Sequence, residues 1–454
     1  MKKVVSKKVI VIAIAVIIVA IIGIAWWYME TSKPKIIKLT AWKWGSDETI
    51  DPKLHEIIDM WNKEHPNTQI ELVIFPELSE AEFITKVEHA TEAGKGPDLI
   101  HGSDVLLAVL AFDGYLEPVP DDVLSVIKQY IPESYISMLK WWGPDGVKRV
   151  YGATFTENGP KVLFVNEYHL QEAGYPADWC PADWDELVDA SIKMTKRKPD
   201  GTLERAGIYI RASGHVGGIF DKFEPFFRSA GGKLLWCEGG KWKTDINSEA
   251  GLRAVQLYLD LLYKYKVYEI GFPGDATAFA KEQNSMLPAR EAWVISYLHV
   301  TSEKFKGPKG FHACPIPPYK KGMPSKTSSH MHGFTVNAKI SDERKKVAWE
   351  FIKWLTRNVE ARKKISVEIA NWIPYKDIIN LPPFDNPVYQ QMTEIAIETS
   401  GSRIYHPKMG LIHNAAGKWL QLIFSQQIDP ERGLDEAAKE ILEIANTCPC
   451  KGEG

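Results

Sequence analysis

Cysteine is scarce in this chain, and neither sign of charge dominates it. Five cysteines occur among 454 residues, and no two of them form a C-x-x-C pair. The spacing therefore gives no support to a zinc site or a thioredoxin-like centre. The net charge is −3 and the isoelectric point is about 6.5. Because the chain has no basic excess, nucleic acid is not expected as a partner.

The sequence also lacks the short motifs of common enzyme classes. It has no G-x-x-x-x-G-K-[ST] loop, no G-x-G-x-x-G after a strand and no G-x-S-x-G elbow. His55-Glu56 opens an H-E-x-x-H pattern, but position 59 is Asp59. We therefore expect no enzyme, no metal and no cofactor. A glycoside hydrolase needs only two carboxylates at a set separation, so that class stays open as an alternative.

One long apolar run lies at the N-terminus. A lysine-rich start precedes an uncharged stretch from Val9 to Trp27, which is long enough to cross a bilayer as a helix. The lysines should stay in the cytoplasm, so the rest of the chain faces outward. We predict a membrane anchor over residues 1–28 and a tether over 29–35. A cleaved signal peptide is the competing interpretation, although no small-x-small cleavage site follows Ala25.

An outward location leaves two interpretations of the cysteines open. Disulfides form outside the cytoplasm, and Cys448 or Cys450 would then hold the C-terminal tail. Free thiols that behave as small buried apolar residues are the alternative. The odd number leaves at least one thiol unpaired in a monomer.

Beyond the tether, the hydrophobic pattern alternates between the periods of a strand and a helix. Asp51-Pro52 is typical of a helix start, and Ser79 with Glu82 forms a capping box. Strands are expected at 36–42, 69–75, 98–100, 162–165, 311–316 and 333–337. Helices are also expected after Asp183 and over 248–266, 341–357 and 434–446. This alternation predicts a parallel sheet covered by helices.

Aromatic residues are abundant, with 16 Trp, 17 Tyr and 17 Phe. Most of them should lie in the core, because aromatic side chains bury a large area. The excess offers flat apolar faces that suit the CH surfaces of sugar rings.

Eight segments together resemble a known family. They are Leu39–Asp47, Asp59–Ile74, Gly94–Ile100, Phe112–Pro118, Tyr151–Glu167, Ala182–Leu187, Ser229–Gly232 and Ala348–Ile352. Each is weak alone, but in this order they are similar to the extracellular solute-binding proteins of ABC importers. The similar group includes the maltose- and trehalose-binding proteins.

The resemblance implies an α/β fold of the periplasmic-binding-protein type II, with two discontinuous lobes joined by a hinge. Lobe one would hold 36–153 and 305–342, lobe two 154–304 and 343–446, and 447–454 would be a flexible tail. A carbohydrate would bind in the cleft and close the lobes. The closed monomer would then dock on the permease subunits of an ABC transporter at the outer face of the cell membrane.

Candidate ligand residues follow from the same resemblance. Trp44 and Asp47 lie after the first strand, where a surface loop is the structural alternative. Asp104 follows the third strand, where it would otherwise serve as a helix N-cap. Glu157 and Asn158 lie at the expected hinge, although Asn158-Gly159 is also a turn dipeptide.

Trp293 is the best single aromatic candidate, with a buried core position as its alternative. Weaker candidates, for which a structural role is the safer interpretation, are Trp236, His332, Trp372 and Tyr405. His330 and His332 flank Met331, but two histidines without a third ligand do not indicate a metal site. Maltose-binding members often carry Trp where this chain has His101, which leaves the sugar undefined. A receptor of the same fold for a peptide or a metal complex is the second alternative function.

Overall fold

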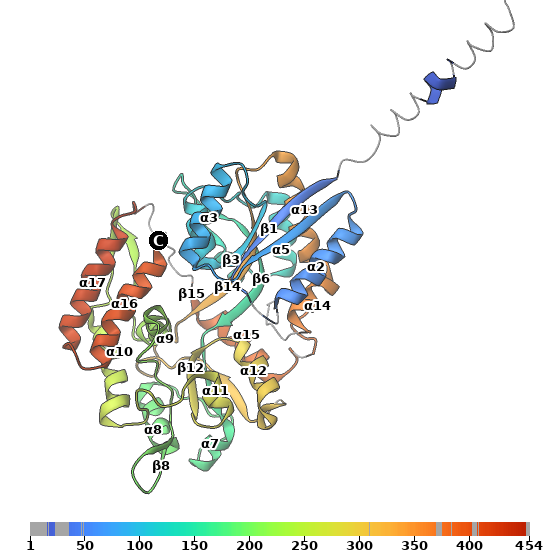
Figure 1. The fold of residues 1–454 in the computed structure, drawn as a ribbon. Helices are drawn as coiled ribbons and strands as arrows, with labels where there is room; N and C mark the ends of the chain where they lie inside the picture. The colour runs from blue at the N-terminus through green and yellow to red at the C-terminus, as the bar shows by residue number, and fades with distance from the viewer. Residues whose placement is uncertain are drawn as a thin grey trace, which may run out of the picture.

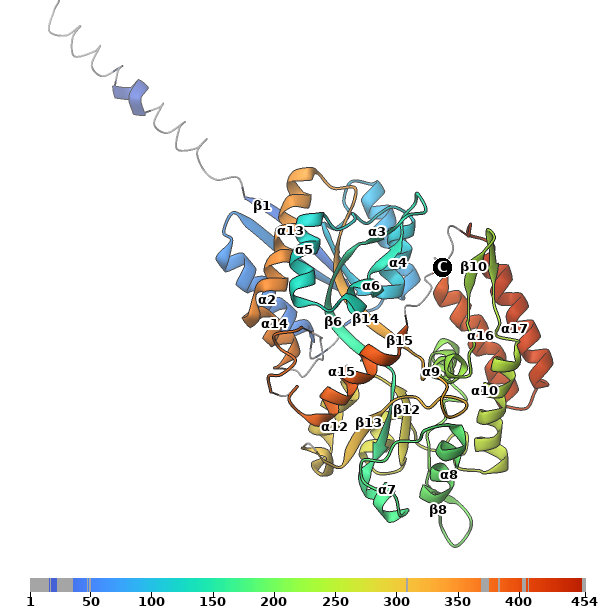
Figure 2. The same cartoon turned by 180° about the vertical axis from the view of Figure 1, so that it is seen from behind.

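The computed structural model describes residues 16, 18–22, 36–46, 48, 50–307, 309–368, 375–382, 384–401, 406 and 408–450. The chain forms two lobes, and strands run from one lobe into the other (Figures 1 and 2). Each lobe is built around its own sheet.

Lobe one contains the larger sheet, with strand order β15-β14-β3-β1-β2 and with β6 also paired to β14. Its strands are β1 (Ile37–Trp44), β2 (Thr68–Phe75), β3 (Leu99–Ser103), β6 (Gly152–Pro160), β14 (Thr327–Val336) and β15 (Ser400–Gly401). Strands β1, β2 and β3 are parallel, as the alternating pattern predicts, whereas β14 runs antiparallel to its neighbours β3 and β6. The sheet is therefore mixed.

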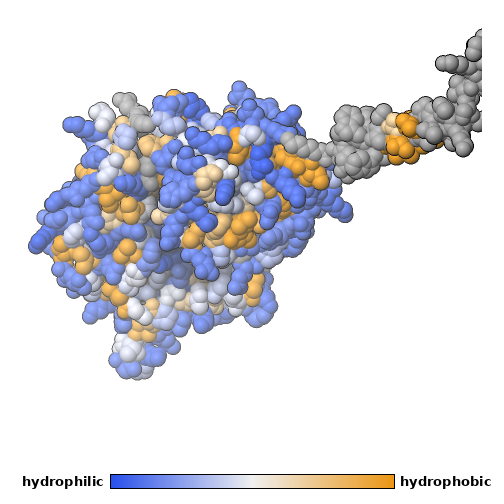
Figure 3. All heavy atoms as spheres, turned by 45° about the horizontal axis from the view of Figure 1, so that its top comes forward, coloured by the Kyte–Doolittle hydropathy of each residue, from blue (hydrophilic) through white to orange (hydrophobic). Residues whose placement is uncertain are grey.

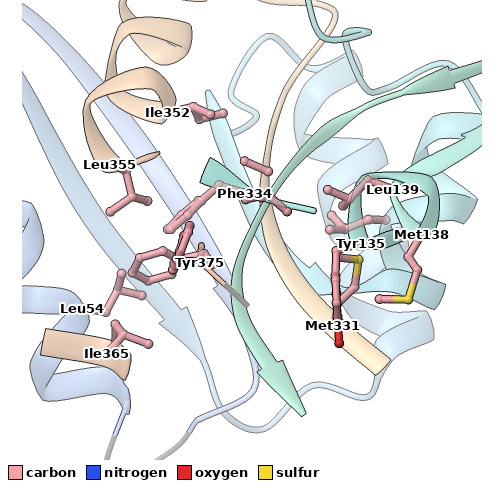
Figure 4. Packing of buried hydrophobic residues seen from close by; sticks show 14 of the residues in the cluster. Leu54, Tyr135, Met138, Leu139, Met331, Phe334, Ile352, Leu355, Ile365 and Tyr375 are labelled. Carbon is pink, nitrogen blue, oxygen red and sulfur yellow. The ribbon is translucent and has the colours of Figure 1, made fainter. Parts of the chain in front are cut away.

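Seven helices and one hairpin complete lobe one. They are α2 (Ile50–Glu64), α3 (Glu80–Glu92), α4 (Asp104–Phe112), α5 (Asp121–Tyr130), α6 (Glu133–Met138), α13 (Asp342–Arg357), α14 (Val359–Ser366), β4 (Lys140–Trp142) and β5 (Lys148–Val150). The predicted capping box at the start of α3 is confirmed, because Ser79 and Glu82 satisfy each other's backbone N–H groups. Figure 4 shows part of the core, where Leu54, Phe334 and Leu355 gather from α2, β14 and α13.

Helix α13 confirms the predicted helix but not its predicted lobe. The sequence-based boundary assigned residues from 343 onward to lobe two, whereas α13 packs on α5, β1 and β14 of lobe one. Arg344 donates two hydrogen bonds of 2.6 Å to the buried carboxylate of Asp98, just before β3. This ion pair and the apolar face of α13 hold the helix on the first sheet.

Lobe two is built on a smaller sheet, in the order β12-β7-β13. Its strands are β7 (Val162–Asn166), β12 (Met286–Arg290) and β13 (Phe311–Cys314), with the hairpins β8 (Lys196–Arg197)–β9 (Leu203–Arg205) and β10 (Trp236–Glu238)–β11 (Lys241–Lys243). Its helices are α7 (Glu167–Glu172), α8 (Trp184–Met194), α9 (Val216–Ser229), α10 (Glu249–Leu259), α11 (Asp275–Ala280), α12 (Trp293–Thr301), α15 (Pro387–Thr399), α16 (Met409–Phe424) and α17 (Pro430–Ala445). A π-helix (Asp260–Lys264) follows α10, and a 3₁₀ turn (Glu303–Phe305) follows α12. The predicted N-cap of α8, Asp183, is confirmed.

The hinge lies where strands leave one sheet and enter the other. Strand β6 pairs in the first sheet, and the next strand, β7, pairs in the second, with Lys161 between them. Strand β13 pairs with β7, whereas β14 pairs with β3 and β6, so the return crossing lies between 314 and 327. The predicted crossings at 153/154 and at 304/305 are therefore displaced along the chain, because strand pairing and not composition sets them.

Four of the five cysteines form disulfides. Cys180 pairs with Cys314 and Cys237 with Cys450, while Cys448 is free. The second bridge holds residues 447–450, which the sequence analysis assigned to a flexible tail. Residues 451–454 lie outside the described part of the chain.

The predicted membrane anchor lies largely outside the described residues. Within the described part, no helix has the length and apolar character that crossing a membrane requires. The few described residues of that region include Val16, Val19 and Ile22, and all three are exposed. Figure 3 shows them as an apolar patch that stands apart from the two lobes.

Candidate functional site

The main cavity between the lobes has a volume of about 840 Å³. Helices α3 and α4 of lobe one form one wall, and α9 and α16 of lobe two form the other. The described polar lining includes Glu80, Glu88, Asp113, His215, Asp221, Lys408, His413 and Asn414. A volume of this size is typical of small-molecule sites.

Glycines allow α9 and α16 to approach each other closely enough to form the wall of lobe two. A Cβ atom at Gly217 would lie 2.7 Å from Oδ1 of Asn414 on α16. A Cβ atom at Gly417 would meet the backbone of Val216 at the start of α9. Because both contacts exclude larger residues, the two helices cross in contact, and Asn414 and Asp221 come to line one cavity.

The wall of lobe one is ordered by hydrogen bonds at two helix starts. Ser103 caps α4 by accepting from the backbone N–H of Leu106, and it donates to Glu80 on α3. Asp104 is the first residue of α4 and is buried, so the prediction that it could be the N-cap is wrong. The neighbouring serine has that role.

A buried lysine organises the wall of lobe two. Lys161, at the hinge crossing, is 0% exposed and pairs with Asp221 and Glu224 of α9. Its Nζ also donates to the backbone oxygen of Asp221 at 2.9 Å. Ser328 of β14 donates to Glu224 at 3.0 Å. A buried charge is costly without a partner, so these contacts stabilise Lys161 in its buried position and fix α9 against both hinge strands.

The same network extends from the cavity to Trp293. Lys222 lies 2.9 Å from a carboxylate oxygen of Asp221 and 3.1 Å from Glu291. The indole N–H of Trp293 donates to Glu291 at 3.2 Å. Trp293 is 41% exposed, so its interpretation as a buried core residue is wrong. Its ring has one neighbouring ring among the described residues, Tyr297 at 6.2 Å.

Trp44 is the last residue of β1 and is half-buried, whereas the sequence analysis placed it in the loop after the strand. Its indole N–H donates to the backbone oxygen of Leu78 at 2.9 Å, and its ring lies 6.3 Å from that of His332. His101 is buried nearby, with its ring 5.9 Å from that of His332. Burial, and then the neighbouring His332 and Lys43, hold the pKa of His101 well below its ordinary value. This imidazole is therefore neutral at physiological pH.

The remaining candidates are only partly described. Glu157 and Asn158 lie on β6, where the backbone of Glu157 is opposite Met331 next to a shift in register. The turn interpretation of this segment is therefore wrong, since it is a strand. Asp47, Trp372 and Tyr405 lie outside the described residues.

None of the predicted ligand residues is in the described lining of the main cavity. Trp44, Asp104 and Trp293 are absent from its described lining. Trp236 lies on the β10–β11 hairpin, with the Lys233 ammonium 5.4 Å from its ring centroid. The sequence analysis missed Lys161, Asp221 and Glu224. The sequence feature that could have identified them is a charged residue within an apolar segment. Lys161 directly precedes a buried strand, and the two acids alternate with the buried phenylalanines of α9.

One group of potential metal ligands lies away from the cleft. Cys180, His312 and Cys314 have ligand atoms within 4.8 Å of one another, and they are the one such group among the described residues. Both sulfurs are joined in a disulfide, so they are not available as thiolates for a metal.

The cleft offers hydrogen-bond acceptors on both walls. Ionised carboxylates accept two or more hydroxyl protons each, which suits a ligand that is rich in hydroxyl groups. Burial, helped by the nearby Asp113, raises the pKa of Glu88 above its usual value. A partly buried carboxyl of this kind is typical of a binding surface.

Comparison with known proteins extends over most of the chain. Residues 45–361 match the model of a family described as bacterial extracellular solute-binding protein. A solute-binding protein of an ABC transporter from Thermotoga lettingae, bound to α-D-tagatose, superposes with a TM-score of 0.70 at 21% identity, over 90% of this chain and 100% of that one. A maltose-bound protein from T. maritima gives 0.69 at 19% identity, over 90% and 100%.

A third similar structure is a cyclic α-maltosyl-1,6-maltose binding protein from Arthrobacter globiformis. It gives a TM-score of 0.69 at 19% identity, and the match covers 91% of this chain and 100% of that chain. At these identities the structural matches establish the two-lobed fold.

Proposed function

Because the chain belongs to the bacterial extracellular solute-binding protein family, we propose that it captures a carbohydrate between its lobes and delivers it to an ABC importer. The observation that carries the proposal is the interlobe cavity of about 840 Å³, which both lobes line with carboxylates and other polar groups. Several proteins of the same fold hold sugars, including maltose and tagatose. Family members are receptors, and no catalytic step is proposed.

Closure of the lobes around the sugar is the proposed mechanism of capture. The cavity walls belong to different lobes, and these are linked by the crossings at Lys161 and between 314 and 327. A change of backbone angles at such crossings rotates one lobe against the other. The sugar favours the closed form because it touches both walls only there.

The sequence-based site residues are retained as proposals. Trp293 is exposed and its indole N–H is held by Glu291, so its ring is ordered before any ligand arrives. A fixed aromatic face of this kind suits stacking on a sugar ring. We assign supporting polar or stacking roles to Trp44, Asp47, Asp104, Glu157, Asn158, Trp372 and Tyr405.

We also propose that residues 1–28 anchor the protein in the membrane, with the lobes on the outer face. The uncharged run from Val9 to Trp27 has the required length. The exposure of Val16, Val19 and Ile22 supports this, since exposed apolar clusters commonly contact a membrane or a partner.

Thermal unfolding of residues 31–454 with a sugar panel tests the proposal. A sugar that binds the folded state alone raises the unfolding midpoint by mass action. At a sugar concentration of one hundred times its Kd, the free energy of unfolding rises by about 2.7 kcal/mol. We expect at least one mono-, di- or oligosaccharide to produce such a shift. Trp293→Ala should reduce it, because Trp293 lies outside the described lining but is joined to Asp221 through Lys222 and Glu291. Trp142→Ala is the matched control, because Trp142 is half-buried under Lys148 on lobe one, in the β4–β5 hairpin.

Other outcomes would replace the proposal. A shift with peptides or metal complexes, and with no sugar, would keep the fold but change the ligand class. Release of product from a reporter glycoside would favour a hydrolase.

A further inference from the structure

The C-terminal segment Thr447–Cys450 follows α17 and is fixed to lobe two. The Cys237–Cys450 disulfide holds its end, and the indole N–H of Trp242 donates to the backbone oxygen of Cys448 at 3.0 Å. Immediately before the segment, Nε2 of His406 lies 3.0 Å from the backbone oxygen of Ala445. The segment is therefore attached at both ends.

The attachment points belong to one rigid unit. Cys237 and Trp242 are opposite each other in the β10–β11 hairpin, and both are buried. The ring of Trp242 also lies edge-on to that of the buried His406, with 4.8 Å between their centroids. Figure 2 shows this hairpin at the edge of lobe two beside α16 and α17. The segment therefore moves with lobe two.

This segment contributes to the interlobe cavity. Cys448 lines it and is half-buried, whereas its neighbours Thr447 and Pro449 are exposed. On the side of lobe one, the described lining includes Glu88 on α3 and Asp113 after α4. Cys448 is thus the contribution of the C-terminal segment to a cavity whose other wall belongs to lobe one.

We propose that Thr447–Cys450 is a fixed wall of the cleft that limits how far a bound oligosaccharide extends past the ends of α3 and α4. The inference rests on the proposed function, since it takes the occupant of the cavity to be a sugar. A covalently held wall excludes longer chains because it cannot move aside without opening the disulfide or shifting all of lobe two.

The position of the wall can be tested without any ligand. Cys448 is the one free thiol of the chain, so Glu88→Cys supplies a second thiol across the cavity. We expect bismaleimidoethane to link Glu88→Cys to Cys448 within the chain at least about tenfold faster than it links His89→Cys. His89 is the matched control because it is exposed on the same helix but is absent from the described cavity lining. Peptide mass spectrometry measures both rates.

The effect of the wall on ligands can be tested on the otherwise unaltered protein. N-ethylmaleimide adds bulk at Cys448, and titration calorimetry with maltose to maltohexaose and mannobiose to mannohexaose measures Kd before and after. We expect the adduct to raise the Kd of the longest sugar that binds by about tenfold or more. The Kd of the shortest sugar should rise by less than about threefold. Cys448→Ser treated in the same way should show no change.

Each result decides a different point. Equal linking of Glu88→Cys and His89→Cys, or an adduct that changes all sugar lengths alike, overturns the inference and leaves the proposed function standing. If the unmodified protein binds no sugar of either series or of the wider panel, the proposed function fails and the inference fails with it.

Discussion

The two lobes are held together by different means. Lobe one is a continuous six-stranded sheet under helices, and all five cysteines lie outside it. Lobe two has a three-stranded sheet, and two disulfides join residues 134 and 213 positions apart. The smaller sheet joins fewer segments of lobe two by strand pairing. The disulfides therefore hold distant segments of lobe two together, as strand pairing does in lobe one.

Buried charge follows the same division. In lobe one, Asp98 is 0% exposed and joins β1 to α13 by accepting from the backbone of Thr40 and from Arg344. In lobe two, Lys161 joins the hinge to α9. One pair stabilises the interior of a lobe, and the other stabilises the surface that faces the cleft. Two variants and a change of pH test this difference between the lobes.

The largest effect is expected from Asp98→Ala. It removes the acceptor of the partly exposed Arg344 and leaves the Thr40 N–H without a partner, and the loss of these hydrogen bonds should together cost about 3–5 kcal/mol. Hydrogen exchange should show loss of protection in β1, β3 and α13, with lobe two little changed. Asp145→Ala, which breaks an exposed pair with Arg149, should leave the stability almost unchanged. Equal loss in both lobes would show that they unfold as one unit.

Removing the Cys180–Cys314 disulfide should act on lobe two. We expect the Cys180→Ser/Cys314→Ser variant to lose about 2–4 kcal/mol, because the bridge closes a long loop. Urea unfolding followed by hydrogen exchange should place the loss in α7, α8 and β13. A matching loss of protection in β1 and β2 would contradict the division between the lobes.

Acid should weaken lobe two through two buried histidines. Burial lowers the pKa of His169 to about 3 and that of His406 to about 4, from 6.5 in the unfolded chain. The unfolded chain therefore binds more protons below pH 6.5, and stability falls as the pH falls. Between pH 7 and pH 5 each histidine should cost about 2 kcal/mol.

The pH profile of His169→Gln checks the sign and the size of this effect. The variant should recover about 2 kcal/mol of the loss between pH 7 and pH 5, whatever its stability at pH 7. An unchanged slope in urea unfolding across this range would refute the assignment to His169.

Local elements were well predicted where the signal was local. The capping box of Ser79 and Glu82 and the N-cap of Asp183 involve groups within a few residues of each other. The apolar stripe of α13 predicted a helix correctly for the same reason. It could not predict the lobe, because the partner of Arg344, Asp98, lies 246 positions away.

The candidate site was predicted less well. Trp293 was identified as a candidate, and its exposure agrees with a surface role. Lys161, Asp221 and Glu224 were not identified, because charged residues near apolar segments are usually exposed. Their burial depends on strands from two separate parts of the chain.

The kinds of secondary structure and the family resemblance could be recognised from the sequence alone. The secondary structure follows from short-range hydrogen bonding and hydrophobic periodicity, which act within a few residues. Tertiary structure decided where the chain crosses between lobes, which cysteines pair and which helices form the cleft. These depend on contacts between residues distant in the chain, such as Gly217 with Asn414, which no local pattern encodes.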